Sequence, residues 1–134
     1  NSIENWDIVK DFLYRNKNFK VSDISSLANI GYTVYTAALT QTGSNAPVAS
    51  VLQNTTGGVF TWSYVSTGKY RITVSNITLP ANKVVIFENA TNDLNLGGKI
   101  TSTTVIDVEQ FSSGGGGYTD VMLPGTSIEI RIYS

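Results

Sequence analysis

The sequence predicts a mainly β fold, an antiparallel β-sandwich or jelly-roll-like domain of about seven strands with one N-terminal amphipathic helix. Three observations support this fold class. Short runs of alternating apolar and polar residues fill the chain from residue 32 onward. Turn-forming residues separate these runs at the intervals typical of all-β domains. No helical pattern lies between the runs, which argues against the crossover helices that a parallel sheet needs.

The N-terminal helix is predicted over residues 3–16, because apolar residues recur there at helical spacing. Asn1 and Glu4 form a plausible capping box at its start. Two roles remain open for this helix. It covers an open end or edge of the β domain, or it ends a longer stalk or anchors the chain to another subunit. Either role buries its apolar stripe, which is therefore the predicted interface. The stripe consists of Ile3, Trp6, Val9, Phe12 and Leu13.

Three segments follow from this reading. Residues 1–20 form the docking or anchor segment, residues 21–31 a polar connector, and residues 32–134 the β-sandwich domain. The chain begins at Asn1 without a methionine, and initiator methionine is normally removed only before a small residue. The chain is therefore expected to be a fragment or a processed product.

The strands are predicted from alternation and from the turns between them. They span residues 32–41, 48–53, 59–64, 69–75, 83–88, 99–109 and 127–133. The continuous apolar run from Val84 to Phe87 indicates a strand buried on both faces. The inward-facing positions predict a core. Its expected members are Trp62, Tyr70, Ile72, Val85, Phe87, Ile106, Ile128 and Ile130.

Composition argues against several classes of function. The formal net charge is −1 and 14% of residues are charged, without the basic face that nucleic-acid binding usually needs. No apolar run approaches the ~20 residues of a membrane-spanning helix, and no signal-peptide pattern opens the chain. The chain has no histidine and no cysteine, which excludes Ser–His and Cys–His hydrolysis and the usual zinc sites. We expect no enzyme activity and no cofactor.

Two patterns could still carry chemistry. Asp107 and Glu109 are two residues apart on a strand and share a face, and paired carboxylates serve glycoside hydrolysis. A charged solvent face is the favoured interpretation. The segment Asn92–Gly98 has oxygen ligands at alternate positions, and a weak calcium site completed by Asp120 is the alternative to a simple turn.

An aromatic row is predicted on one strand. Phe60, Trp62 and Tyr64 alternate and therefore share a face. Such a row is the usual content of a sandwich core, but an exposed row can stack on sugar rings. The alternative function is thus a carbohydrate-binding module, with a host-surface glycan as its ligand. The exposure of Trp62 discriminates between the two interpretations.

A set of strand and turn residues carries a family resemblance. These residues are Tyr35–Gly43, Ala46–Val48, Val51, Leu52, Asn54, Thr55, Gly57, Gly58, Trp62, Gly68–Tyr70 and Thr126–Arg131. Over roughly residues 32–134 the chain resembles small β-rich structural domains of tailed phages that infect Bacteroidetes, including crAss-like phages. The resemblance implies a non-enzymatic virion protein of a fibre, head decoration or tail. It also implies partners: other copies of the chain, with a homotrimer expected first, and neighbouring virion proteins.

Overall fold

The computed structural model describes residues 31–134 of the chain. The helix predicted over residues 3–16, with Ile3, Trp6, Val9, Phe12 and Leu13, lies outside the described residues. The residues from Tyr32 to Ser134 form one of the two compact units into which the chain divides. This unit is all-β, as its alternating pattern predicts, and has no helix among its described residues.

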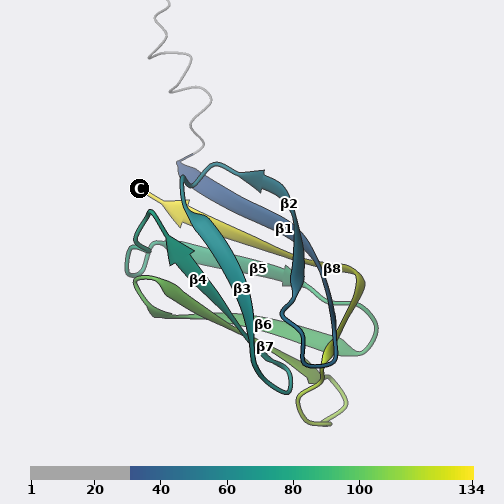
Figure 1. Cartoon of the computed structure of the whole chain (residues 1–134). Helices are drawn as coiled ribbons and strands as arrows, with labels where there is room; N and C mark the ends of the chain where they lie inside the picture. The colour runs from purple at the N-terminus through teal and green to yellow at the C-terminus, as the bar shows by residue number, and fades with distance from the viewer. Residues whose placement is uncertain (1–30) are drawn as a thin grey trace, which may run out of the picture. The chain divides into compact units, whose positions relative to one another are not determined.

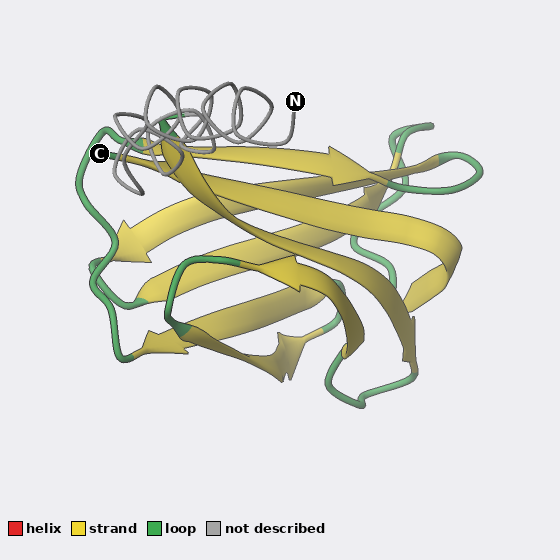
Figure 2. Ribbon diagram, turned by 90° about the horizontal axis from the view of Figure 1, so that it is seen from above, coloured by secondary structure: helices red, strands yellow, loops and turns green. Residues whose placement is uncertain are grey.

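Eight strands form two antiparallel four-stranded sheets that lie face to face as two layers (Figures 1 and 2). Sheet A has the strand order β2-β1-β8-β5, and sheet B has the order β3-β4-β7-β6. The strands are β1 (Tyr32–Thr42), β2 (Val48–Asn54), β3 (Val59–Ser66), β4 (Lys69–Ser75), β5 (Val84–Asn89), β6 (Leu94–Ser102), β7 (Val105–Ser112) and β8 (Val121–Tyr133). The sandwich-like arrangement agrees with the predicted fold class.

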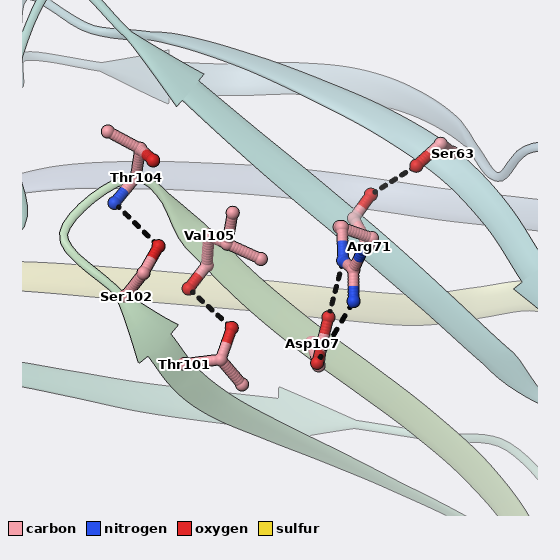
Figure 3. Close-up of polar contacts among 7 residues, drawn as sticks. All are labelled: Ser63, Arg71, Thr101, Ser102, Thr104, Val105 and Asp107. Atoms are coloured by element: carbon pink, nitrogen blue, oxygen red, sulfur yellow. Dashed lines mark hydrogen bonds and ion pairs between the residues drawn. The ribbon is translucent and has the colours of Figure 1, made fainter.

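The eighth strand comes from a turn that the sequence did not signal. The run predicted as one strand over 99–109 is the hairpin of β6 and β7, which turns at Thr103 and Thr104. This turn contains no glycine, proline, asparagine or aspartate. It is instead held by the side chain of Ser102, whose Oγ accepts a 3.2 Å hydrogen bond from the amide of Thr104 (Figure 3).

The core lies between the two sheets and follows the strand alternation. Most of the predicted core residues are buried. They are Trp62, Tyr70, Ile72, Ile106, Ile128 and Ile130. Tyr35, Ala37 and Leu39 of β1 complete the sheet A side. Burial of these side chains is the main favourable contribution to folding.

Val85 and Phe87 contradict the core prediction, since they are 40% and 48% exposed. The apolar run that contains them is an edge strand of sheet A, not a strand buried on both faces. Val84 and Ile86 pack against the core, so the alternation turns Val85 and Phe87 outward. The guanidinium of Arg131 lies 4.7 Å from the Phe87 ring. The continuous apolar run Val84–Phe87 is therefore buried on one face only.

The sandwich is closed on the side where β5 and β6 meet. The Oε1 atom of Glu88 on β5 accepts a 2.7 Å hydrogen bond from the amide of Gly98 on β6. Glycine suits this position, because a Cβ atom on residue 98 would lie only 3.1 Å from Cγ2 of Ile86. The edge strands β2 and β3 end the two sheets on the opposite side.

Candidate functional site

The aromatic row of β3 belongs to the core. Trp62 is only 9% exposed, and its Nε1 donates a 3.2 Å hydrogen bond to the hydroxyl of Tyr35. Phe60 stacks on the Tyr35 ring at 4.1 Å. The hydroxyl of Tyr64 donates a 2.8 Å bond to Oδ2 of Asp120. The row is therefore part of the core, the favoured interpretation, and the alternative of an exposed glycan-stacking row is not supported, because this face of β3 turns toward sheet A.

Asp120 is engaged in the domain's own hydrogen bonds. Its Oδ1 accepts a 2.6 Å bond from the amide of Gly68, in addition to the bond from Tyr64. Of the segment Asn92–Gly98, only Asn92 and Asp93 form a turn, and the residues from Leu94 onward belong to β6. Within residues 31–134 no group of three or more acidic side chains is placed to hold a metal ion. The turn is thus shorter than predicted, and Asp120, which was to complete a calcium site, is bound by Tyr64 and Gly68.

A buried polar chain at one end of the sandwich was missed by sequence reasoning. The hydroxyl of Tyr70 donates a 2.9 Å bond to Oε1 of Gln41, whose Nε2 donates to the carbonyls of Gly43 at 2.6 Å and Asn45 at 3.0 Å. Burial, and then the nearby carboxylate of Asp120, raise the pKa of Tyr70 far above its ordinary value. The hydroxyl of Tyr70 therefore stays protonated and acts as a donor. These hydrogen bonds connect the β1–β2 loop to sheet B.

The predicted carboxylate pair lies on the outer face of sheet B, as alternation requires. Asp107 on β7 is opposite Arg71 on β4. The guanidinium of Arg71 donates to both carboxylate oxygens of Asp107, at 2.8 and 3.5 Å (Figure 3). Glu109, two residues along, accepts a 3.4 Å hydrogen bond from the hydroxyl of Tyr118. The pair thus occupies a partly solvated polar face.

An open depression of about 440 Å³ lies beside these carboxylates on the outer face of sheet B. We call it the sheet B depression. It is lined by Gly97, Gly98, Lys99, Thr101, Asp107, Glu109 and Phe111. Gly97 is paired with Glu109 and has no side chain, so the outer face is hollow at this position. The sequence signalled Gly97 and Gly98 only as a turn, although both lie within β6.

One exposed ring lines the depression, and a second lies next to its lining residues. Phe111 lines it and Tyr118 pairs with Phe111 through an isolated β-bridge, and the two residues are 40% and 46% exposed. The ammonium of Lys69 lies 4.7 Å from the centre of the Tyr118 ring. Tyr118 follows the glycine-rich loop at 114–117, and no pattern in the sequence predicted that this loop would turn its ring back to Glu109.

A second surface feature is the side formed by β2 and β3, called here the β2–β3 edge. Neither strand contains a charged residue. Five large aliphatic side chains are exposed there. They are Val48, Val51, Leu52, Val59 and Val65. Leu52 is 66% exposed, and it lies where a register shift in the β1–β2 pairing adds an extra residue to β2.

Comparison with known proteins finds no matching family model, no matching curated protein and no matching solved structure. None of residues 31–134 belongs to a helix that could cross a membrane. The function is therefore inferred from the residues and their geometry.

Proposed function

We propose that this chain is a non-enzymatic structural domain that acts by protein–protein assembly, with the β2–β3 edge as its assembly surface. The virion setting comes from the resemblance to phage structural domains. The observation that carries the proposal is an uncharged pair of edge strands with exposed aliphatic side chains.

Edge strands expose unpaired backbone groups, and proteins that stay monomeric usually protect such edges with charges, proline or bulges. The opposite edges have this kind of protection. Glu88 on β5 bonds to β6, and β6 itself has Lys99 and two glycines. On β2 and β3 the protective features are register irregularities at Leu52 and Val65, and both of these residues are apolar. The asymmetry favours the β2–β3 edge as the side that meets a partner.

The partner that fits this edge best is a second copy of the chain. Uncharged aliphatic surfaces complement one another without opposite charges, so three copies that turn this side toward a common axis would bury their exposed valine and leucine side chains together. This arrangement accounts for the expected homotrimer. Neighbouring virion proteins remain proposed partners of the same kind of surface.

The carbohydrate-binding function that depended on Phe60, Trp62 and Tyr64 is not retained, since these side chains contact the core. The carboxylate pair also gives little support to catalysis, because Asp107 is already bound by Arg71.

The test is the mass of the native protein in solution, measured by light scattering after size exclusion. We expect a trimer, and we expect Leu52→Lys to reduce it to a monomer with an unchanged circular dichroism spectrum. A lysine on an edge strand opposes pairing with another chain. The matched control is Val85→Lys, which places the same charge on the exposed face of the opposite edge and should leave the trimer intact. A monomeric native protein, or a Leu52→Lys variant of unchanged mass, contradicts the proposal.

A further inference from the structure

We infer that the sheet B depression is a binding site for a neutral saccharide, a function separate from assembly through the β2–β3 edge. Three features support this assignment: a strand glycine that the fold does not require, exposed aromatic rings held in place, and anchored carboxylates at the rim.

Gly97 is the first feature. Its φ is not in the left-handed region, and a Cβ atom built on it would meet no heavy atom within 4 Å. The neighbouring Gly98 differs, since a Cβ there would lie 3.0 Å from Oε1 of Glu88. A glycine inside a strand weakens the strand and often marks the close approach of a ligand or of another backbone. Among the described residues, no other backbone lies within 4 Å of the position of this Cβ atom, which leaves room for a ligand.

The aromatic rings are the second feature. The apolar C–H face of a sugar ring packs on an aromatic face, and Phe111 and Tyr118 offer exposed faces in one cross-strand row. Tyr118 is restrained at both its hydroxyl, by Glu109, and its ring, by Lys69. Restraint before binding lowers the entropy that binding costs.

The polar rim is the third feature. Carboxylate oxygens accept short, strong hydrogen bonds from hydroxyl groups such as those of sugars. Asp107 is held by the two bonds from Arg71, and Glu109 lies beside it with one bond from Tyr118. Within residues 31–134, Oε1 of Glu109 has no hydrogen-bond partner and is available to a ligand. Lys99 adds a donor on the β6 side, and the hydroxyl of Thr101, which donates to the carbonyl of Val105, adds an acceptor.

The charge of the lining favours a neutral ligand. One lysine stands against two carboxylates, Asp107 and Glu109, so the lining has a formal net charge of −1. Because Arg71 neutralises Asp107, an anionic sugar would be repelled chiefly by Glu109. The volume of about 440 Å³ falls in the lower part of the range of about 300–1,000 Å³ for small-molecule sites. The end of a saccharide chain fits this size.

The experiment is affinity electrophoresis of the full chain in gels containing one soluble polysaccharide each. The probes are mixed-linkage β-glucan, xylan and galactomannan as neutral polymers, and alginate as the acidic one. We expect retardation by at least one neutral polymer and none by alginate. Calorimetry with oligosaccharides of the retarding polymer then gives the dissociation constant.

Gly97→Leu should fill the depression while keeping both carboxylates and both rings in the sequence, and Phe111→Ala should remove the stacking surface. Each is expected to weaken binding by at least about tenfold, equivalent to about 1.4 kcal/mol. The matched control is Phe87→Ala, which removes a similarly exposed ring from the outer face of sheet A and should leave binding unchanged.

Thermal melting of each variant distinguishes a blocked site from an unfolded domain. Gly97→Leu should melt at or above the native temperature, since a Cβ atom at this position would meet no heavy atom within 4 Å. The inference is overturned if no neutral polymer retards the native chain, if only alginate does, or if a folded Gly97→Leu variant binds like the native protein.

Discussion

The indole Nε1 of Trp62 and the hydroxyl of Tyr35 are joined by a 3.2 Å hydrogen bond that links β3 of sheet B to β1 of sheet A. Both side chains are buried, and Phe60 stacks on the Tyr35 ring. Burial also raises the pKa of Tyr35, so its hydroxyl remains protonated. The two sheets are thus connected by a polar contact at the centre of an apolar layer, where an unpaired donor or acceptor would be costly.

Loss of one partner of this contact should destabilise the domain. We expect Tyr35→Phe and Trp62→Phe each to reduce the free energy of unfolding by about 1–3 kcal/mol, with Trp62→Phe also leaving a cavity. Urea denaturation of both variants and of the double variant measures the coupling between them. Additive effects would show that the hydrogen bond contributes nothing beyond packing.

Two aliphatic residues of sheet A should respond very differently to truncation. Ile130→Ala removes a fully buried side chain and should cost about 2–5 kcal/mol. Val85→Ala, at an exposed position of the edge strand, should remain within about 0.5 kcal/mol of the native protein. Equal losses in denaturant melts would contradict the inward and outward assignments of these strands.

Alanine substitution should also have opposite effects on stability at two glycines, Gly68 and Gly97. Gly68 has a φ of +65°, and a Cβ there would lie 2.5 Å from the carbonyl oxygen of Gln110. Gly68→Ala should therefore lose more than about 1 kcal/mol. Gly97→Ala should gain up to about 1 kcal/mol, because alanine loses less entropy than glycine in a strand. A stable Gly68→Ala variant would show that the β3–β4 turn relaxes easily.

Glu88 should make stability depend on pH. Burial raises the pKa of its carboxyl above the ordinary 4.5, although the amide of Gly98 opposes the shift. The folded state thus binds a proton more tightly than the unfolded state. The free energy of unfolding should therefore fall as the pH rises from about 4.5 through the folded-state pKa of Glu88. Glu88→Gln keeps an acceptor for Gly98 and should remove this decline. A comparison of melting temperatures between pH 4 and 8 checks it, and parallel pH profiles would argue against the role of Glu88.

Deletion of residues 1–20 should leave a folded β domain, because every member of the described core lies between Val34 and Ile130. We expect a cooperative melt together with weaker assembly or attachment, since the apolar stripe of the N-terminal segment is predicted to be an interface. Calorimetry and light scattering before and after the deletion measure the two properties. An unfolded product would show that the segment belongs to the core, and normal assembly would show that it docks nothing.

The candidate site was only partly predictable. Alternation correctly placed Asp107 and Glu109 on one outward face, because side-chain direction along a strand is a local property. The hollow at Gly97 and the ring of Tyr118 could not be predicted with them. Gly97 lies beside Glu109 because of the register between β6 and β7. Tyr118 comes near Glu109 because it forms a β-bridge with Phe111.

By itself, the sequence determined that this chain forms antiparallel strands and which face of most strands is apolar, since both depend on neighbours within a few residues. The inward placement of Ile72, Ile128 and Ile130 follows from that pattern. Only the tertiary structure decided that β5 is an edge strand with Phe87 exposed and that the row containing Trp62 is covered. The reason is physical: strand order and the opposing sheet determine which apolar faces are buried, and pairing between residues far apart in the chain decides both.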